Sequence, residues 1–372
     1  MKLSAVVLLL CTFQATSGQA YDPLTHVPAI GVNAWERGPC MATSDYQALG
    51  TNNVKFFRTG FNEEEAASLD DTVLRAAQAG VQILPILHTY VAPPTTEAQL
   101  TTFEQFSRNM VLRYGPGGSF WYPGGTLRTD IPYLPLRAWE VWNEPNLSSN
   151  WGGLPTSPTQ YLTLLTRTKA AVRSADGAAC IVFAGLALRG ADANTNGGVT
   201  FLQQVLAQSG SVAAFNALGA HSYPTLPSDI QNHLTIMRNT LNAAGSSAEI
   251  WTTEFGWPTG GTTSSHPAVS LATQDNYLSE TITRVEAQRS TLKLGPIFWF
   301  AFRDLTPGSG NPCEAGYAAS SWSNYLGVRT SQTNGNSAKP AWATLGIRAQ
   351  AAPALPIPLG VTAAEPTWLI HP

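Results

Sequence analysis

The 372-residue chain is predicted to fold as a single (β/α)8 barrel, the TIM barrel of the α/β class. Eight short apolar runs follow one another between residues 21 and 350, and amphipathic helical stretches lie between them. Strands that are apolar on both faces and alternate with helices form a parallel sheet covered by helices. The runs are Ala29–Asn33, Val54–Thr59, Val81–Leu87, Leu136–Trp142, Cys180–Gly185, Phe215–His221, Ile250–Glu254 and Pro296–Phe300.

The number of these units favours a closed barrel over an open doubly wound sheet, which is the alternative. An open sheet of that kind usually carries a glycine-rich phosphate-binding turn after its first strand. Gly31–Trp35 has no such pattern, so the barrel is the better prediction.

Two of the helix candidates have recognisable ends. Asn62 and Glu65 form a capping-box pattern before a helix predicted over residues 66–79, and Gly80 stands where a left-handed residue would end it. Ser157–Gln160 combine a capping serine, a first-turn proline and a glutamine at the third helical position. Both patterns place helices directly after predicted strands.

The chain divides into three parts. Residues 1–20 read as a secretory signal peptide, because Lys2 precedes a short apolar run and a stretch of small residues; a buried N-terminal strand is the alternative. Residues 21–350 form the barrel domain, closed by a last helix over 340–349, and the Pro- and Ala-rich residues 351–372 are expected to form a loose tail. No later apolar run is long enough to span a membrane, so we expect a secreted protein.

Composition excludes several classes of partner. The net charge of -3 argues against nucleic acid, whose phosphates require a basic surface. The six histidines show no metal-ligand spacing, and neither a serine nucleophile elbow nor a phosphate loop is present. We therefore expect no metal, no cofactor and no nucleic acid, and we expect a monomer.

Two glutamates end predicted strands among aromatic and apolar neighbours. Glu144 follows the fourth run, and Glu254 ends the seventh. The C-terminal ends of the strands carry the chemistry in barrels of this kind. Two carboxyl groups there can hydrolyse a glycosidic bond, one protonating the leaving oxygen and the other acting at the anomeric carbon. The alternative is a buried structural ion pair with Arg58, and Glu140 is expected to be a buried partner of an arginine below the mouth.

The sequence around Glu144 resembles a known group of enzymes. Trp142-Asn143-Glu144-Pro145 resembles the acid/base signature of the clan A glycoside hydrolases. The stretches Arg113–Trp121 and Trp139–Asn146 resemble most the family 39 and family 5 branches, which include cellulase-like enzymes. Together with Thr253–Trp257, the similarity covers roughly residues 28 to 348.

The resemblance implies a role for each matching position. Glu144 would be the acid/base and Glu254 the nucleophile of a retaining mechanism. Arg58 would keep Glu254 charged, and Asn143 would hydrogen-bond the 2-hydroxyl of the sugar. The remaining implied roles belong to Tyr223, which would orient the nucleophile, and Trp299, which would form the floor of the sugar subsite.

Other candidate ligands come from the residues themselves. His88 and His221 end strands and are expected to contact sugar, although a core histidine is the alternative for each. Trp142 and Trp257 lie near the predicted mouth, where aromatic faces stack on sugar rings. Three tryptophans in loops could serve as subsite walls, namely Trp35, Trp151 and Trp322.

The cysteines predict one disulfide. Cys40 follows the first strand and Cys313 the eighth, and these strands are neighbours when a barrel closes. We therefore expect a Cys40–Cys313 bond and a free, buried Cys180, with three free thiols as the alternative. Asn146 lies in a glycosylation sequon that we expect to be unused, because a glycan there would crowd the cleft.

The predicted function is retaining hydrolysis of O-glycosidic, β-linked bonds in a polysaccharide or oligosaccharide. Endo-acting cleavage is favoured over an exo-acting β-glycosidase such as a β-xylosidase. A non-catalytic sugar-binding barrel and a transglycosylase are the alternatives from other classes.

Overall fold

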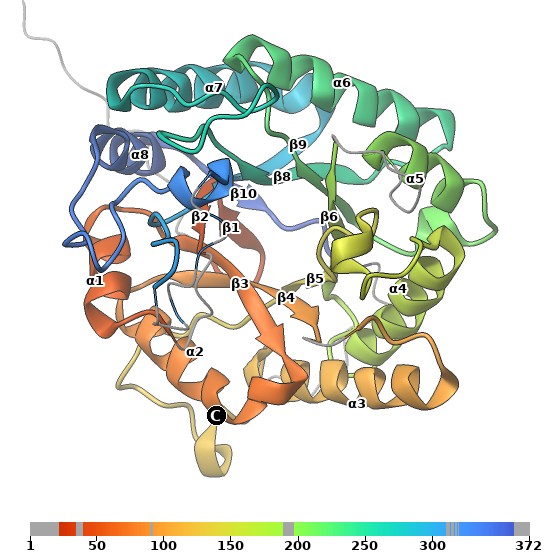
Figure 1. The fold of residues 1–372 in the computed structure, drawn as a ribbon. Helices are drawn as coiled ribbons and strands as arrows, with labels where there is room; N and C mark the ends of the chain where they lie inside the picture. The colour runs from red at the N-terminus through yellow and green to blue at the C-terminus, as the bar shows by residue number, and fades with distance from the viewer. Residues whose placement is uncertain are drawn as a thin grey trace, which may run out of the picture.

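The computed structural model describes residues 22–34, 40–89, 92–188, 197–309, 313, 316, 318 and 320–360. Eight parallel strands form a closed barrel in the order β2 to β9 (Figure 1), which confirms the predicted fold. The strands are β2 (Ile30–Asn33), β3 (Phe56–Asn62), β4 (Gln82–His88), β5 (Ala138–Val141), β6 (Cys180–Ala187), β7 (Ala217–His221), β8 (Glu249–Phe255) and β9 (Leu294–Trp299). Each lies within a few residues of its predicted run.

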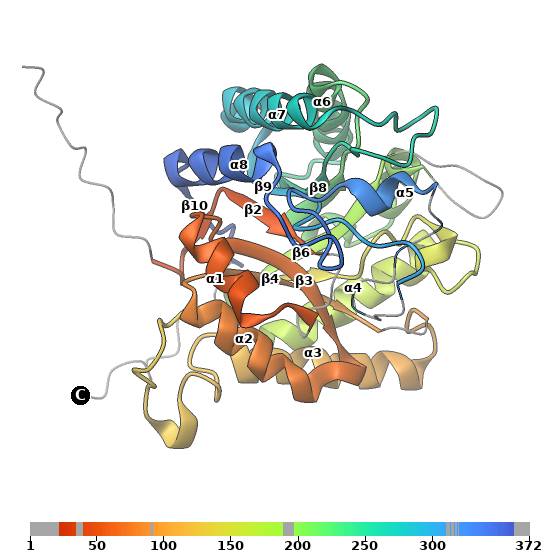
Figure 2. The ribbon, with the colours of Figure 1, turned by 60° about the vertical axis from the view of Figure 1, so that its left-hand side comes forward.

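Helices surround the barrel, with α6 and α7 on the side opposite α2 and α3 in both views (Figures 1 and 2). The α-helices are α1 (Thr43–Thr51), α2 (Leu69–Gln78), α3 (Glu97–Tyr114), α4 (Pro158–Arg173), α5 (Gly198–Leu206), α6 (Pro227–Ala243), α7 (Leu271–Leu292) and α8 (Pro340–Ala351). The short 3-10 helices are η2 (Glu63–Ser68), η3 (Pro123–Gly125), η4 (Ser148–Asn150), η5 (Ser211–Ala213) and η6 (Trp322–Tyr325). The strands are almost entirely buried, because side chains fill the barrel on one face and pack under helices on the other.

The predicted start of the second helix is partly wrong. Residues 63–68 wind as the 3-10 helix η2, and the α-helix begins only at Leu69. Asn62 is still the last residue of β3, and its side-chain amide donates to Glu65 at 3.5 Å instead of capping a backbone N–H. The expected left-handed stop is present, since Gly80 has φ 68°.

The cap predicted at Ser157 is confirmed, because its side chain accepts a hydrogen bond from the backbone N–H of Gln160. Pro158 occupies the first turn of α4, where its missing N–H costs no hydrogen bond.

The prediction of a loose tail is wrong for its described part. Strand β10 (Ala354–Pro356) pairs antiparallel with β1 (His26–Pro28), and the N–H of Ile357 donates to the carbonyl of Thr25 at 2.8 Å. Leu355 and Ile357 are buried, so apolar side chains alternate along a segment whose high content of proline and alanine suggested no structure. β1 directly precedes β2, and Leu355 and Pro356 of β10 line a cavity together with residues at the N-terminal ends of β8 and β9.

The predicted signal peptide and residues 361–372 lie outside the described residues. Among the helices that are described, none combines the length and apolar character needed to cross a bilayer.

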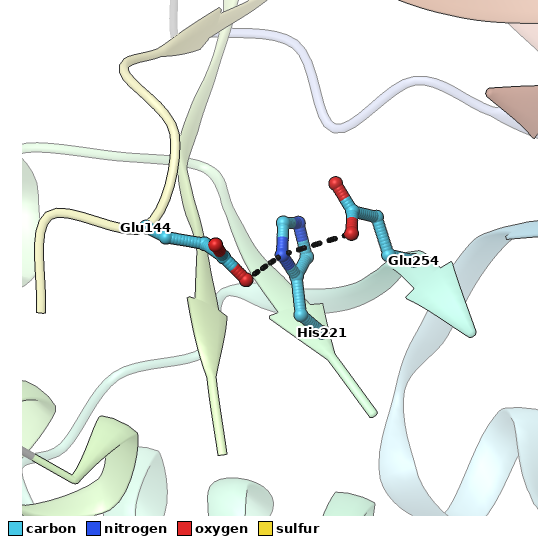
Figure 3. A group of neighbouring side chains, drawn as sticks. All are labelled: Glu144, His221 and Glu254. Atoms are coloured by element: carbon cyan, nitrogen blue, oxygen red, sulfur yellow. Dashed lines mark hydrogen bonds and ion pairs between the residues drawn. The ribbon is translucent and has the colours of Figure 1, made fainter. Parts of the chain in front are cut away.

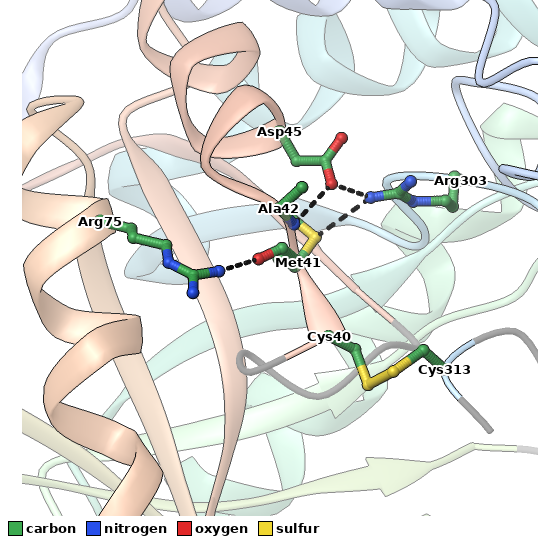
Figure 4. The surroundings of a disulfide bond; sticks show 7 residues. All are labelled: Cys40, Met41, Ala42, Asp45, Arg75, Arg303 and Cys313. Atoms are coloured by element: carbon green, nitrogen blue, oxygen red, sulfur yellow. Dashed lines mark hydrogen bonds and ion pairs between the residues drawn. A yellow bond between two sulfur atoms is a disulfide. The ribbon is translucent and has the colours of Figure 1, made fainter. Parts of the chain in front are cut away.

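The disulfide is present between Cys40 and Cys313 (Figure 4), and Cys180 is free and buried, as predicted. The bond joins the segment after β2 to the long segment after β9. Next to it, Asp45 of α1 forms a buried ion pair with Arg303 and accepts a hydrogen bond from Asn336 at 3.1 Å. The segment between β9 and α8 is therefore held to α1 at several points.

The burial of Ile357 predicts that the C-terminal segment stabilises the domain. Ile357→Ala should lower the free energy of unfolding by about 2 kcal/mol, because it removes buried methyl groups and leaves a cavity. The matched control is Ile347→Ala, since that side chain is 67% exposed and its loss should change stability by less than about 0.5 kcal/mol. Guanidinium denaturation of both variants measures the difference, and equal stabilities would show that the segment contributes nothing.

Candidate active site

Three side chains meet at the C-terminal end of the barrel (Figure 3). Glu144 comes from the turn after β5, His221 ends β7, and Glu254 lies in β8. The Nδ1 atom of His221 lies 2.8 Å from Glu144 Oε1 and 3.4 Å from Glu254 Oε2. One carboxylate oxygen of Glu144 and one of Glu254 lie within 4.8 Å of each other. The two predicted carboxyl groups therefore face each other across one imidazole ring.

The backbone after β5 directs Glu144 into this position. Trp142 and Glu144 have φ values of 73° and 45°, in the left-handed region that non-glycine residues seldom adopt. The N–H of Glu144 donates to the carbonyl of Gly185 in β6 at 3.0 Å, which anchors the turn to the neighbouring strand. Such strain persists where the surrounding structure determines the conformation, and it is concentrated at functional sites.

Arg58 of β3 lies beneath the carboxyl groups and is 2% exposed. Its Nη1 donates to Glu254 Oε1 at 2.8 Å, and its Nη2 donates to Asn143 Oδ1 at 2.8 Å. Its Nε and Nη2 also donate to the two oxygens of Glu140, at 2.6 and 2.8 Å. Glu140 is thus the buried arginine partner that the sequence predicted.

Glu254 has two strong hydrogen-bond donors. Besides Arg58, the hydroxyl of Tyr223 donates to Glu254 Oε2 at 2.6 Å. Burial raises the pKa of Glu254, whereas the charge of Arg58 and the hydrogen bond from Tyr223 act in the opposite direction. Tyr223 therefore has the contact with Glu254 that the resemblance implied.

The ionised form of Glu144 has fewer stabilising contacts. Burial raises its pKa to about 7, opposed by the charge of Arg58 and by a hydrogen bond from Asn150. Asn150 Nδ2 donates to Glu144 Oε2 at 2.8 Å, and the side chain of Glu144 is 17% exposed. The two glutamates thus have different surroundings, and Glu144 keeps its proton up to a pH of about 7.

His221 is electrically neutral in this arrangement, because burial lowers its pKa to about 4. Its Nε2 atom is buried and finds no hydrogen-bond partner among the described residues, which favours the tautomer with the proton on Nδ1. A Cβ atom on Gly185 would lie 1.9 Å from Nε2, so only glycine leaves room for the imidazole. Gly185 also donates its N–H to Glu140 Oε1 at 2.8 Å.

Two cavities flank Glu144. The first, of about 200 Å³, holds both glutamates, and the second, of about 240 Å³, lies beside Asn143 and Asn150. The first is lined by Glu144, Leu147, Ala187, Leu188, His221, Tyr223, Glu254, His266, Phe300, Trp322, Ser323 and Leu326. The second is lined by His88, Thr89, Ala92, Trp142, Asn143, Ser149, Asn150 and Gly152.

A larger cavity of about 640 Å³ lies at the N-terminal ends of β7 to β9, beside Asn216, Glu249 and Lys293. It holds a single carboxyl group among its lining residues, and barrel enzymes carry their chemistry at the opposite face. The site is therefore assigned to the two smaller cavities.

His88 and Trp142 line the second cavity, as their predicted roles require. The His88 ring is held by a contact between Nδ1 and the carbonyl of Thr89 at 3.3 Å, and burial lowers its pKa to about 4. Trp142 is only 4% exposed, so it offers an edge to the cavity while most of its ring packs in the core.

The predictions for Trp257 and Trp299 are wrong. They are 2% and 0% exposed, and their indole N–H groups donate to the carbonyls of Thr225 and Leu326. Both rings pack into an aromatic cluster that reaches Tyr277 of α7, on the helix side of the sheet. Phe300 and Trp322 line the first cavity in their place.

Of the loop tryptophans, only Trp322 lies in the site. Trp151 is 1% exposed and belongs to the core, and Trp35 lies outside the described residues. Asn146 is buried, with its amide donating to the carbonyl of Ala187 at 2.9 Å, which agrees with an unused sequon.

Sequence reasoning missed four positions. Asn33 ends β2 and accepts a hydrogen bond from Arg58 at 2.9 Å, and the rule that polar strand ends form the site could have found it. Asn150, Gly185 and His266 carry no local signal, because their roles depend on segments brought together by the fold.

Among the described residues, one group has ligand atoms close enough together to hold a metal ion, and it consists of Glu144, His221 and Glu254. Their mutual hydrogen bonds and the partners Arg58, Tyr223 and Asn150 already satisfy these atoms. The geometry therefore matches acid–base and nucleophilic chemistry by the side chains themselves.

Residues 140–314 match the family model of the glycosyl hydrolase catalytic core. No curated protein sequence matches the chain. Many solved structures share the fold, among them the following three. A family 39 glycoside hydrolase from the gut symbiont Bacteroides cellulosilyticus WH2 is 16% identical, with a TM-score of 0.58 over 86% of this chain and 63% of that one.

A glucosidase from Croceicoccus marinus is 13% identical, with a TM-score of 0.58 over 88% of this chain and 69% of that one. An exo-β-1,4-mannosidase from Opitutaceae bacterium strain TAV5 is 12% identical, with a TM-score of 0.53 over 87% of this chain and 59% of that one. The chain thus spans less than two thirds of the family 39 and mannosidase structures. The chain thus contains a segment that matches a glycosyl hydrolase catalytic core, and it shares the closed barrel of these structures.

Proposed function

We propose that the protein is a secreted, monomeric, retaining glycoside hydrolase that cleaves β-linked bonds within a polysaccharide, with Glu144 as acid/base and Glu254 as nucleophile. The observation that carries the proposal is the separation of the two carboxyl groups, whose nearest ligand oxygens lie within 4.8 Å. Retaining enzymes hold these groups about 5 to 5.5 Å apart, whereas inverting enzymes leave about 6.5 to 9.5 Å for a water molecule.

In the first step, Glu254 attacks the anomeric carbon while Glu144 gives its proton to the leaving oxygen, so the glycosidic bond breaks as the ester bond forms. In the second step, Glu144 takes a proton from water, and the oxygen of that water displaces Glu254 and regenerates both groups. The role of Asn143 at the 2-hydroxyl is supported by its hydrogen bond to Arg58, which engages the amide oxygen and leaves the NH2 group as the donor.

The different surroundings of the glutamates support this division of roles. Glu254 is paired with the permanently charged Arg58, as a nucleophile requires, whereas Glu144 has a pKa near 7, as a general acid requires at neutral pH. The neutral His221 lies between them and does not add a charge that would ionise Glu144.

The remaining parts of the proposal rest on separate observations. Two cavities, one lined by Glu144 and the other by its neighbours Asn143 and Asn150, support binding of several sugar units and therefore endo action. The β linkage rests on the resemblance around Trp142–Pro145, and one structure of the same fold is named for β-1,4-mannoside cleavage. The Cys40–Cys313 bond supports export, because disulfides persist in oxidising compartments.

Removing either carboxyl group should abolish hydrolysis. Glu144→Ala should lower kcat/KM by about 10² to 10⁴-fold, which is the contribution of a positioned general acid, and Glu254→Ala should lower it at least as much. Release of reducing ends from β-glucans, xylans and exopolysaccharides measures this, with Glu249→Gln at the other end of β8 as the control. Activity that survives both alanine substitutions would overturn the mechanism.

The products give a second test of the same proposal. Proton NMR should show the β-anomer of the new reducing end first, followed by slow mutarotation. Initial release of the α-anomer would indicate inversion and contradict the covalent mechanism. Release of single sugars from the chain end at early times would indicate exo action.

The pH dependence of the activity should reflect the pKa of Glu144. Activity should fall as pH rises through about 7, because the acid then loses the proton that it must donate. Asn150→Ala should shift this loss of activity to a pH roughly one unit higher. A hydrogen bond to a charged group contributes about 1.5 kcal/mol, and one pKa unit corresponds to about 1.4 kcal/mol.

Ser149→Ala is the matched control, because that side chain lines the same cavity and has no bond to Glu144 among the described contacts. If the pH at which activity falls stayed the same in Asn150→Ala, or shifted equally in Ser149→Ala, Asn150 would not set the pKa of Glu144.

A further inference from the structure

The first cavity has an aromatic wall that comes from two loops. Trp322 of η6 lies in the segment between β9 and α8, and His266 lies in the segment between β8 and α7. Their rings are stacked, with centroids 3.8 Å apart and an interplanar angle of 6°. Both residues are half-buried and line the cavity that holds Glu144 and Glu254.

The two loops are held together independently of this stack. The carbonyl of Tyr325 accepts hydrogen bonds from the N–H and the hydroxyl of Thr259, at 2.9 and 3.2 Å. Gly261 has φ 63°, and a Cβ atom there would lie 2.4 Å from the carbonyl oxygen of Ser321. The backbones therefore approach closely on both sides of the ring pair, which gives Trp322 a defined position.

The wall is connected to the nucleophile through one side chain. The ring of Tyr223 meets the indole of Trp322 edge-on, with centroids 5.1 Å apart, and meets Phe300 at 6.3 Å. The hydroxyl of the same Tyr223 donates to Glu254 at 2.6 Å. A ring placed on this wall therefore lies next to the carboxylate that attacks the anomeric carbon.

We propose that Trp322, backed by His266, is the stacking platform for a pyranose ring in the cleft, and that it replaces the buried Trp299 in this role. The proposal rests on the proposed function for the identity of the ligand as a sugar. The C–H face of a pyranose ring is apolar and flat, and a tryptophan ring offers a large apolar surface at a low cost in conformational entropy. His266 holds the indole in place before the ligand arrives, so less freedom is lost on binding.

The test measures binding without turnover. In a Glu254→Gln background, titration calorimetry with laminaritetraose, cellotetraose and xylotetraose identifies the tightest of the three ligands. Trp322→Ala should weaken binding of that ligand at least about tenfold, which corresponds to about 1.4 kcal/mol. Trp322→Phe keeps a ring and should stay within about threefold, and His266→Ala should fall between the two.

Trp257→Phe is the matched control, since that indole is buried among core aromatics and should leave the dissociation constant unchanged. The ligand-induced change in tryptophan fluorescence gives a second readout in variants that still bind. The ligand-induced change should remain in Trp257→Phe and should largely disappear in Trp322→Phe, although this variant still binds.

Unchanged affinity in Trp322→Ala, or a full fluorescence change in Trp322→Phe, would overturn the platform, as would failure of all three oligosaccharides to bind. These outcomes are separate from the catalytic test. If hydrolysis survived the loss of Glu144 and Glu254, the mechanism would fail while a binding loss in Trp322→Ala would still establish the platform.

Discussion

The buried guanidinium of Arg58 is the interaction on which the site depends. A charge at this depth costs several kcal/mol unless its hydrogen bonds are satisfied. All five N–H donors of Arg58 are used, two toward Glu140 and one each toward Glu254, Asn33 and Asn143. These partners come from three strands or their ends, β2, β5 and β8, so the barrel must close correctly before the charge is compensated. The hydrogen bonds of Arg58 thus both stabilise the C-terminal end of the barrel and fix the positions of the carboxyl groups.

This network also makes the two facing glutamates unequal. Burial raises the pKa of both groups, but Arg58 bonds directly to Glu254 and acts on Glu144 only through its charge. His221 lies between them and stays neutral because it is buried as well. The close pair therefore combines a carboxyl group bonded to Arg58 with one whose pKa is about 7, which suits the division of roles proposed above.

The loops supply what the strands lack. The strands end in polar groups, and the only tryptophan of β9 faces the helix layer, so the barrel alone offers little surface for an apolar sugar face. The segment after β9 provides Trp322 and is held by the Cys40–Cys313 bond and by the Asp45–Arg303 ion pair. Fixing a long loop in this way places an aromatic ring beside Glu254 without requiring it to order during binding.

The sequence by itself determined the order of the eight strands, the polar residues at their ends and the pair Glu144 and Glu254, because period, burial and strand ends are local properties. It also predicted the Cys40–Cys313 bond, since closure of the barrel makes the first and eighth strands neighbours. Only the tertiary structure decided which tryptophans reach the cleft and that the segment after Ala351 forms a strand. Those outcomes depend on which face of a strand a loop covers and on contacts between segments far apart in the chain, and local sequence patterns carry no record of either.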